Sequence, residues 1–355
     1  MTHTITVNVP PTSYDVTIGS GVRHQCGEIL RPLLGDCRVA IITDTTVAPL
    51  YLSGVRQSLE TAGFQVCAMT FPAGEAHKNM TTLTQILEFL ATEQLSRNDC
   101  VIALGGGVVG DMAGFAAGCF LRGIRYVQMP TTALSAIDSS VGGKTAIDLS
   151  AGKNLAGLFL QPTAVICDTE CLQSLPRDIL ADGFAEGLKT GVLVGGSLFE
   201  TVSQGLPTPE GLAQMLAECV AYKGGVVERD EREMGERKLL NLGHTPAHAI
   251  ELCSNFGILH GHAVAIGTAM MARAAVKRGV LDVHIANMVV EAIAKSGLPI
   301  TTHFDPEQLA EAALHDKKRA GDTITVVLPH GLGDCRLHKL PITELAMLFA
   351  QGLED

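Results

Sequence analysis

Three histidines in one short stretch of the second half are the residues best suited to chemistry. His244 and His248 lie four positions apart, and His260 follows twelve positions later. Upstream, Glu186 and Lys189 have the three-residue spacing that places two side chains on one face of a helix. A carboxylate with two or three imidazoles suits a divalent ion such as zinc and leaves a position open for a substrate. One histidine on an apolar helix is more often a core residue, but this clustering favours a metal site.

A glycine run is the second candidate for chemistry. Gly105-Gly106-Gly107-Val108-Val109-Gly110-Asp111 follows directly after the apolar run Val101 to Leu104. Glycines at a strand-to-helix turn let backbone N–H groups approach a pyrophosphate, and the helix N-terminus favours its negative charge. The spacing differs from the usual GxGxxG because three glycines lead. A tight turn with close helix packing is the alternative interpretation, and the residues alone leave both open.

Two lysines lie in segments rich in glycine, serine and asparagine that are typical of loops. Lys144 ends the stretch that begins at Asp138, and Lys153 stands between Gly152 and Asn154. Such lysines could hold a phosphate or a carboxylate, although the Walker spacing is absent and solvated surface lysines are the alternative. Further cations that could join them in an anion pocket are Arg122, Lys223, Arg237, Lys317 and Lys318.

The elements that must position these residues differ between the two halves. In the first half, β-branched runs alternate with helical stretches, which predicts a parallel sheet covered on both faces, with ligands at the carboxyl ends of its strands. Alternation over Met1 to Pro10 predicts a further strand and not a signal peptide. The predicted strands of the sheet are Val39 to Thr43, Gln65 to Phe71, Val101 to Leu104, Tyr126 to Met129 and Ala164 to Cys167.

Helical spacing dominates the second half, where only Thr323 to Leu328 resembles a strand. Pro246 fits the first turn of a helix capped by Thr245, which would leave His244 just outside that helix. We therefore predict an α/β fold with a Rossmann-like parallel-sheet domain at 1–176, a mainly α-helical domain at 177–355, and the active site in the cleft between them. The predicted helices are Arg177 to Val194, Pro209 to Glu231, Ala263 to Gly279, Val283 to Ser296 and Ile342 to Leu353.

Composition excludes several classes of protein. The net charge of -11 over 355 residues argues against a nucleic-acid partner, so an anionic substrate needs a local cluster of cations. The ten cysteines are scattered, as in a reduced cytoplasmic protein. The most apolar run, Ala263 to Val276, is interrupted by Arg273 and is too short to span a bilayer, so no membrane partner is expected.

The order of these motifs resembles that of the 3-dehydroquinate synthase family through most of the chain. Three features depart from the family pattern: Pro246-Ala247, His262 after His260-Gly261, and the segment Ala133 to Ala136. The motifs that carry the resemblance are Thr43-Asp44, Gly74-Glu75 with Lys78, Gly105 to Asp111, Arg122 to Arg125, Pro130 to Thr132, Asp138 to Thr145, Gly152 to Asn154, Ala185-Glu186 with Lys189, Asn241 to His244, His248-Ala249 with Glu251, His260-Gly261 and Asp316 to Lys318.

The resemblance implies a role for each matching residue. It implies zinc or cobalt held by Glu186, His244 and His260. The implied NAD contacts are Asp44, Glu75, Lys78, Gly106, Gly107, Asp111, Thr131, Thr132, Lys144, Lys153, Ser174 and Leu175. The implied catalytic and substrate-binding residues are Asp138, Lys144, Lys153, Asn154, Lys189, Lys223, Arg237, Asn241, His248, Lys317 (or its neighbour Lys318) and Arg122, the last reaching the phosphate across a homodimer.

The activity that this resemblance implies is conversion of 3-deoxy-D-arabino-heptulosonate 7-phosphate to 3-dehydroquinate and phosphate, a step of the shikimate pathway. The cofactor would be reduced and reoxidised within one turnover. Two alternatives stay open: a related sugar phosphate cyclase of the inosose or valiolone type, because His-Gly-His also occurs there, and a metal-dependent polyol dehydrogenase. His248 argues against the valiolone type, and a dehydrogenase would need fewer phosphate-binding cations and would release NADH.

Overall fold

The structure, a computed structural model, describes residues 2–314 and 319–353. The chain divides into two compact units. The α/β unit comprises Met1–Leu175 and Lys223–Glu228, and the helical unit comprises Pro176–Tyr222 and Arg229–Asp355. The sequence places one boundary after residue 176, whereas a short part of a later helix, Lys223–Glu228, also belongs to the first unit.

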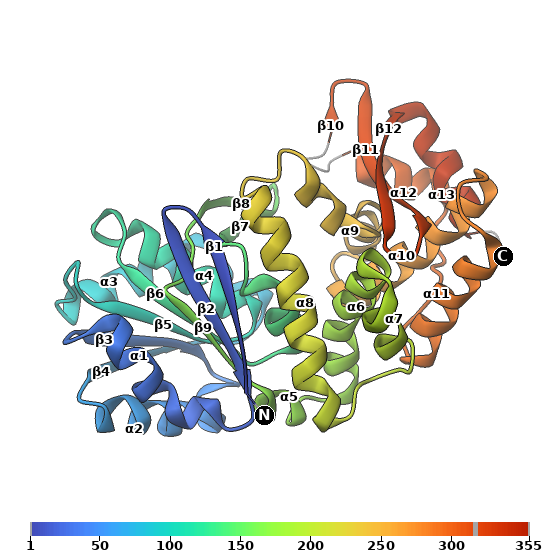
Figure 1. Ribbon diagram of the computed structural model, residues 1–355. Coiled ribbons are helices and arrows are strands. Elements are labelled where there is room, and N and C mark those ends of the chain that lie inside the picture. Colours follow the sequence, from blue (N-terminus) through green and yellow to red (C-terminus); the bar gives the residue numbers. More distant parts are fainter. Residues whose placement is uncertain (1, 315–318, 354–355) are drawn as a thin grey trace. The chain divides into compact units, whose positions relative to one another are not determined.

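A seven-stranded sheet forms the centre of the α/β unit (Figure 1). All neighbouring strands run parallel except the first pair, which forms an antiparallel hairpin at one edge. All five predicted strands and the predicted N-terminal strand are confirmed. In sheet order the strands are β1 (His3–Val9), β2 (Thr12–Gly19), β9 (Ala164–Asp168), β6 (Arg125–Pro130), β5 (Cys100–Gly105), β3 (Arg38–Asp44) and β4 (Gln65–Phe71).

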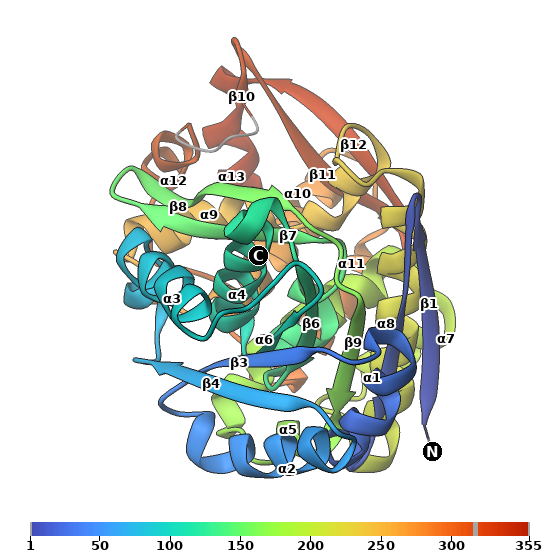
Figure 2. The same ribbon diagram turned by 90° about the vertical axis from the view of Figure 1, so that its left-hand side faces the viewer.

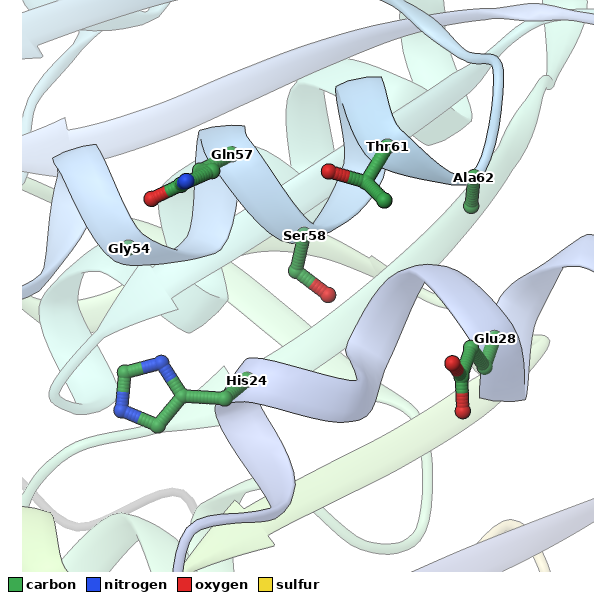
Figure 3. Close-up of a pocket in the computed structure, with 7 residues that line it drawn as sticks. All are labelled: His24, Glu28, Gly54, Gln57, Ser58, Thr61 and Ala62. Carbon is green, nitrogen blue, oxygen red and sulfur yellow. The ribbon is translucent and has the colours of Figure 1, made fainter.

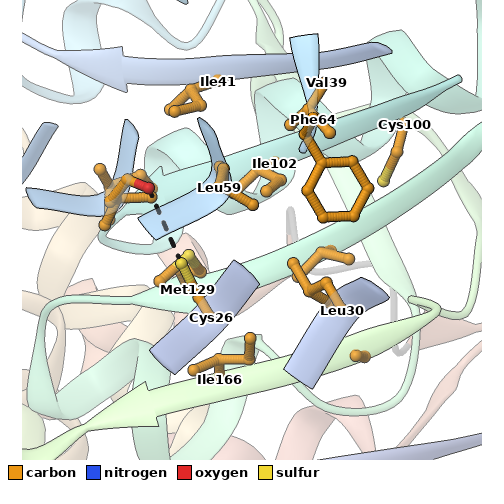
Figure 4. Packing of buried hydrophobic residues seen from close by; sticks show 14 of the residues in the cluster. Cys26, Leu30, Val39, Ile41, Leu59, Phe64, Cys100, Ile102, Met129 and Ile166 are labelled. Atoms are coloured by element: carbon orange, nitrogen blue, oxygen red, sulfur yellow. Dashed lines mark hydrogen bonds between the residues drawn. The ribbon is translucent and has the colours of Figure 1, made fainter. Parts of the chain in front are cut away.

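Successive strand residues point to opposite sides of this sheet, and both sets are apolar. Helices therefore cover both faces. Val39 and Ile41 pack with α1 (Cys26–Leu34) and α2 (Ser53–Thr61) in the cluster that Figure 4 shows. The opposite face packs against α3 (Met80–Thr92) and α4 (Gly107–Cys119). Each large aliphatic side chain buried in these layers contributes roughly 1.5–3 kcal/mol. The predicted two-sided cover is confirmed, and Figure 2 shows the same sheet after a turn of 90° about the vertical axis.

The lysine-bearing segments predicted as loops are two strands, so that prediction was wrong. β7 (Lys144–Leu149) and β8 (Gly152–Phe159) pair as an antiparallel hairpin. Thr145 and Ile147 are buried, whereas Lys144 is exposed. The hairpin packs closely on α4, since a Cβ at Gly114 would lie 2.5 Å from Thr145 Cγ2. These segments have the composition of loops, but their packing against small residues of α4 stabilises them as strands.

The helical unit contains every helix predicted for the second half. Two of its helices begin at proposed ligands, and α10 begins three residues earlier than predicted. The helices are α6 (Arg177–Val194), α7 (Gly196–Val202), α8 (Pro209–Arg229, shared with the α/β unit), α9 (His244–Cys253), α10 (His260–Lys277), α11 (Val283–Lys295), α12 (Pro306–Ala313) and α13 (Leu345–Leu353). The shorter helical segments of both units are η1 (Val22–Gln25), η2 (Ala48–Leu52), η3 (Glu75–His77), η4 (Phe120–Arg122), η5 (Ser135–Ser139), α5 (Thr169–Gln173), η6 (Glu236–Asn241) and η7 (Ile342–Glu344).

The single late strand predicted from the sequence is part of a three-stranded sheet. β10 (Arg319–Ala320), β11 (Thr323–Gly331) and β12 (Asp334–Pro341) pair antiparallel in that order. β12 was missed because it carries many polar residues, most of them exposed or half-buried, which weakens the alternation.

Two further features of the fold concern the cysteines and the length of the helices. All ten cysteines lie in the described part of the chain, and none of them forms a disulfide bond. Over residues 2–314 and 319–353, no helix combines the length and the apolar character that a bilayer crossing requires.

Candidate functional site

All three predicted metal ligands come together in the helical unit. Glu186 lies in the middle of α6, His244 is the first residue of α9, and His260 is the first residue of α10. One donor atom from each residue lies within 4.8 Å of the other two. Glu186 Oε1 is 3.4 Å from His244 Nε2 and 3.6 Å from His260 Nε2, and the Glu186 side chain is fully buried.

These separations fit a divalent ion better than direct contact between the side chains. Zinc binds imidazole nitrogen and carboxylate oxygen at about 2.0–2.2 Å, so two ligands at a tetrahedral centre lie roughly 3.4 Å apart. The observed 3.4 and 3.6 Å match that edge and exceed the usual length of an N–H···O hydrogen bond. The residue types and their spacing therefore suit a zinc-like or cobalt-like ion.

Each histidine of the cluster has its second ring nitrogen beside an acceptor. His244 Nδ1 lies 3.2 Å from the backbone oxygen of Leu242, and His260 Nδ1 lies 3.3 Å from Glu251 Oε2. An acceptor at Nδ1 keeps the proton on that nitrogen and leaves the Nε2 lone pair for a metal. Both rings accordingly turn Nε2 toward Glu186.

The start of α9 differs from the prediction. The helix begins at His244 and not after Thr245, and Gly243 is the residue before it, with φ 76°. A Cβ at Gly243 would lie 2.5 Å from Thr268 Oγ1 of α10. Glycine is required here for both the left-handed backbone and the close approach of the two helices, which places His244 near His260.

Negative charge dominates the surroundings of His260. Burial lowers the pKa of His260, but the carboxylates of Glu186 and Glu251 outweigh that effect and raise it to about 10. Lys189 Nζ forms an ion pair with Glu186 Oε2, and both side chains are buried. The cluster thus favours a cation at the position that faces Glu186.

Other predicted residues of the helical unit lie near these helices. The His248 ring centroid is 5.6 Å from that of His244 and 6.3 Å from that of His260. Arg237 in η6 is buried, and its guanidinium donates to the backbone oxygen of Glu231. Asn241 Nδ2, also in η6, donates to Glu233 Oε1. The predicted pocket residue Lys317 and its neighbour Lys318 lie outside the described residues.

The glycine run of the α/β unit stands at the carboxyl end of β5 and at the start of α4. Thr131 N donates to Gly105 O over 2.9 Å, which ties the ends of β5 and β6 together. A Cβ at Gly106 would lie 3.0 Å from Thr132 Cγ2, and one at Gly107 would lie 3.2 Å from Ser139 Oγ. The turn is therefore tightly packed and also presents the N-terminal amides of a 13-residue helix, as an anion site requires.

Ion pairs and a hydrogen bond connect five predicted residues of the α/β unit in two neighbouring groups. Lys78 Nζ lies 2.6 Å from Asp111 Oδ2 and donates to Asn154 Oδ1 over 2.5 Å. Lys153 Nζ lies 3.8 Å from Glu75 Oε1. Burial opposes the charge of Lys78, but Asp111 and Glu75 outweigh it and raise the pKa of Lys78 above its ordinary value. The structure thus brings together residues from three separate motifs.

A second pairing in this unit joins residues far apart in the sequence. Lys223 Nζ donates to both the backbone oxygen and Oδ1 of Asp138, each over 2.6 Å. Lys144 and Arg122 are exposed, and Arg122 has a left-handed backbone with φ 69°. The sequence nominated all four residues but contained no signal that Lys223 and Asp138 pair.

The remaining predicted NAD contacts lie at strand or helix ends. Asp44 ends β3, and its Oδ1 accepts hydrogen bonds from Thr46 N and Val47 N over 2.8 and 2.9 Å. Ser174 follows α5, where its hydroxyl contacts that of Tyr51, and Leu175 is the last residue before the helical unit.

Two residues to which sequence reasoning assigned no role support the predicted ones. Asp148 N donates to Lys78 O, and Asp148 Oδ1 accepts from Asn154 N, each over 2.8 Å. Glu251 contacts His260. The seven-residue spacing from His244 to Glu251 could have placed Glu251 on the ligand-bearing face of a helix, since seven residues are two helical turns.

A surface hollow in the α/β unit lies apart from the predicted residues. Figure 3 shows it between α2 and the segment formed by η1 and α1. No residue predicted for catalysis, cofactor or metal binding lines it. Its lining residues are His24, Glu28, Gly54, Gln57, Ser58, Thr61 and Ala62.

Comparison with known proteins agrees with the resemblance found in the sequence. Residues 68–182 match the family described as 3-dehydroquinate synthase N-terminal, and residues 183–319 match 3-dehydroquinate synthase C-terminal. The 3-dehydroquinate synthase of Streptococcus suis is 40% identical over 96% of this chain and 98% of that protein. The 3-dehydroquinate synthase of Pelobacter propionicus is 42% identical over 99% of both.

Solved structures of two cyclases have the same fold. A 2-deoxy-scyllo-inosose synthase complexed with carbaglucose-6-phosphate, NAD+ and Co2+ is 26% identical, with a TM-score of 0.89 over 99% of this chain and 100% of that one. A 2-epi-5-epi-valiolone synthase from Streptomyces hygroscopicus, with NAD+ and Zn2+ bound, has a TM-score of 0.87 over 97% and 98% of the two chains; at 24% identity it shows the fold alone. From the family matches and the near full-length relatives, we conclude that this chain belongs to the 3-dehydroquinate synthase family.

Proposed function

We propose that this enzyme is a 3-dehydroquinate synthase, which converts 3-deoxy-D-arabino-heptulosonate 7-phosphate to 3-dehydroquinate and phosphate. Relatives that carry this name match nearly the whole chain. The observation that carries the proposal is the cluster of Glu186, His244 and half-buried His260, because its donor types and spacing fit a divalent ion. An NAD-binding module without catalytic activity would leave this cluster without a role.

The proposed cofactors are NAD and one zinc or cobalt ion. The inosose synthase of the same fold was solved with NAD+ and Co2+, which supports both cofactors here. Glu186, His244 and His260 would hold the ion, and the amides at the start of α4 with Asp44, Lys78 and the other predicted contacts would hold NAD. When bound, the ion supplies Lewis acidity and NAD supplies a reversible hydride acceptor.

The chain's own side chains would hold the substrate and move its protons. Lys144, Lys153 and Arg122 are proposed to bind the phosphate, because a positive charge beside a departing phosphate stabilises the developing negative charge. His248 lies beside the ligand histidines, with its ring 5.6 Å from that of His244, and is proposed to transfer protons near the ring oxygens. Asn241 is proposed to share that proton transfer with His248. Asp138, Asn154, Lys189, Lys223 and Arg237 are proposed to orient the sugar acid.

One assay distinguishes this function from the alternatives. The purified protein is incubated with the heptulosonate phosphate, Zn²⁺ and NAD far below the substrate concentration. We expect equimolar phosphate and 3-dehydroquinate, over many turnovers per NAD, without a net rise in NADH absorbance. Stoichiometric NADH would favour a polyol dehydrogenase, and turnover only of a sugar phosphate without the carboxylate would favour an inosose- or valiolone-type cyclase.

Three expectations from the sequence stay predictions: the homodimer, the cytoplasmic location and the location of the active site between the domains. The homodimer matters for the chemistry, because the resemblance implies that Arg122 acts across it. Light scattering of the purified protein measures the oligomer. Mixing an inactive Arg122→Ala chain with an inactive Glu186→Ala chain then tests the shared site, since a mixed dimer would recover one working site.

A further inference from the structure

Glu251 is a buried carboxylate that the proposed ligand set does not include. It lies near the end of α9, seven residues after His244, so both side chains lie on one face of this helix, two turns apart. Glu251 is 4% exposed. A buried carboxylate is costly unless it is paired, and Glu251 Oε2 is 3.3 Å from His260 Nδ1.

The two nitrogens of His260 face different carboxylates. Nε2 lies 3.6 Å from Glu186 Oε1, the separation expected of two ligands of one ion, while Nδ1 lies within reach of Glu251. His244 has the same arrangement, but its Nδ1 faces the neutral backbone oxygen of Leu242. The two ligand histidines therefore differ in the charge of the acceptor behind them.

We propose that Glu251 is a positioning residue of the metal centre. It accepts the Nδ1–H of His260, which fixes the tautomer, turns Nε2 toward Glu186 and makes that nitrogen a stronger donor to a cation. This inference rests on the proposed metal assignment. It adds that α9 supplies a ligand at its first residue and, two turns later, the carboxylate that orients the ligand at the start of α10.

The chain contains a matched control for this contact. His262, two residues after His260 in α10, has its Nδ1 3.0 Å from Asp182 Oδ1. His262 is not among the residues that group as a possible metal site in the described part of the chain. His262→Ala therefore removes a histidine–carboxylate contact from the same helical turn without removing a proposed ligand or its orienting group.

The experiment measures metal affinity in the full-length protein. Wild type, Glu251→Gln, Glu251→Ala and His262→Ala are freed of metal with a chelator, and Zn²⁺ is titrated against a chromophoric competitor. We expect one Zn²⁺ per wild-type chain. Loss of an outer-shell carboxylate weakens metal binding on the order of 10- to 100-fold, and we expect this range for Glu251→Ala, with Glu251→Gln weakened less because its amide oxygen can still accept.

Two further readouts separate orientation from damage to the fold. The visible absorption of bound Co²⁺ should change in both Glu251 variants and stay unchanged in His262→Ala. Excess Zn²⁺ should restore much of the activity that Glu251→Gln loses at limiting Zn²⁺.

Three results would overturn the inference, each in a recognisable way. A wild-type protein that binds no Zn²⁺ removes the metal assignment and this inference with it. A wild-type protein that binds Zn²⁺, with unchanged affinity and Co²⁺ spectrum in Glu251→Gln, removes the inference alone. An equal loss of Zn²⁺ affinity in His262→Ala shows that any disturbance of this helix turn weakens metal binding, so the contact of Glu251 with His260 has no special role. If Glu251→Ala does not fold, the comparison of Glu251→Gln with His262→Ala still tests whether Glu251 orients His260.

Discussion

The two units differ in the kind of group that is predicted to bind a ligand. In the helical unit, Glu186, His244 and His260 are short or ring side chains on three helices, and their donor atoms converge within 4.8 Å. In the α/β unit, the predicted groups are backbone amides at the start of α4 and long lysine side chains. These lysines already have carboxylate partners: Lys78 with Asp111, Lys153 with Glu75 and Lys223 with Asp138.

This difference between the two units follows from the geometry that each kind of ligand requires. A metal ion requires donor atoms within a few tenths of an ångström of fixed positions, so rigid side chains on packed helices suit it. A phosphate or a dinucleotide accepts several arrangements of charge and N–H groups, so flexible lysines suit it. Pairing these lysines with acids limits their mutual repulsion, and an arriving phosphate must then compete with the carboxylates.

The largest expected effect comes from removing a rigid donor. His260→Ala should abolish stoichiometric metal binding and lower kcat/KM by about a thousandfold or more, because a Lewis acid contributes several kcal/mol. Metal analysis and steady-state kinetics measure both effects. Full metal retention with normal activity would remove His260 from the ligand set, and circular dichroism of the variant controls for folding.

The next effect tests whether buried pairs hold the α/β unit together. Lys78→Ala leaves Asp111 without its ammonium partner, and Lys78 is only 5% exposed. We expect a loss of about 3 kcal/mol in the free energy of unfolding, measured by urea denaturation. Lys78→Ala combined with Asp111→Asn should recover part of that loss, since no buried charge then remains; an equally unstable double variant would argue against the pair.

A smaller effect is expected at a half-exposed lysine. Lys153→Ala should lower kcat/KM at least about tenfold, because a charge-assisted contact to an anion contributes roughly 1.5–3 kcal/mol. Its pair with Glu75 is 3.8 Å long and partly exposed, so the melting temperature should barely change. Lys339→Ala, at an exposed position of β12, is the matched control. Unchanged kinetics of Lys153→Ala at low ionic strength would show that Lys153 is a solvated lysine.

The smallest effect tests whether imidazoles alone make a metal site in the helical unit. His330 Nε2 and His338 Nε2 lie 2.8 Å apart, but the nearby Asp334 pairs with Arg336. His338→Gln should therefore leave one Zn²⁺ per chain. A second equivalent in wild type that His338→Gln lacks would show that this pair also binds metal.

The same variant should change the dependence of stability on pH. Burial, with His330 and nearby arginines, lowers the pKa of His338 below 6.5, so the unfolded chain takes up a proton there before the folded one does. The contribution of neutral His338 to the free energy of unfolding is complete above pH 6.5. It is lost as the pH falls from 6.5 toward the lower pKa that His338 has in the folded protein. The wild-type melting temperature should fall more steeply below pH 6.5 than that of His338→Gln, and identical slopes would contradict the shift.

The sequence by itself determined the features that depend on local pattern. The β-branched runs predicted five strands of the sheet, and the helical spacing predicted α6 with the bounds observed. The residue types and spacing of Glu186, His244 and His260 were sufficient to nominate a metal site, and the ordered motifs were sufficient to name the family. Each of these signals lies within one strand, one helix or one short motif.

The tertiary structure decided what depends on contacts between distant segments. β7 and β8 form strands because Gly114 of α4 lets the hairpin pack closely, and α9 begins at His244 because Gly243 meets Thr268 of α10. Lys223 is 85 positions from Asp138, and no local pattern joins them. The orientation of His260 depends on Glu251 in the preceding helix, because the direction of a histidine ring is set by the acceptor that holds its second nitrogen.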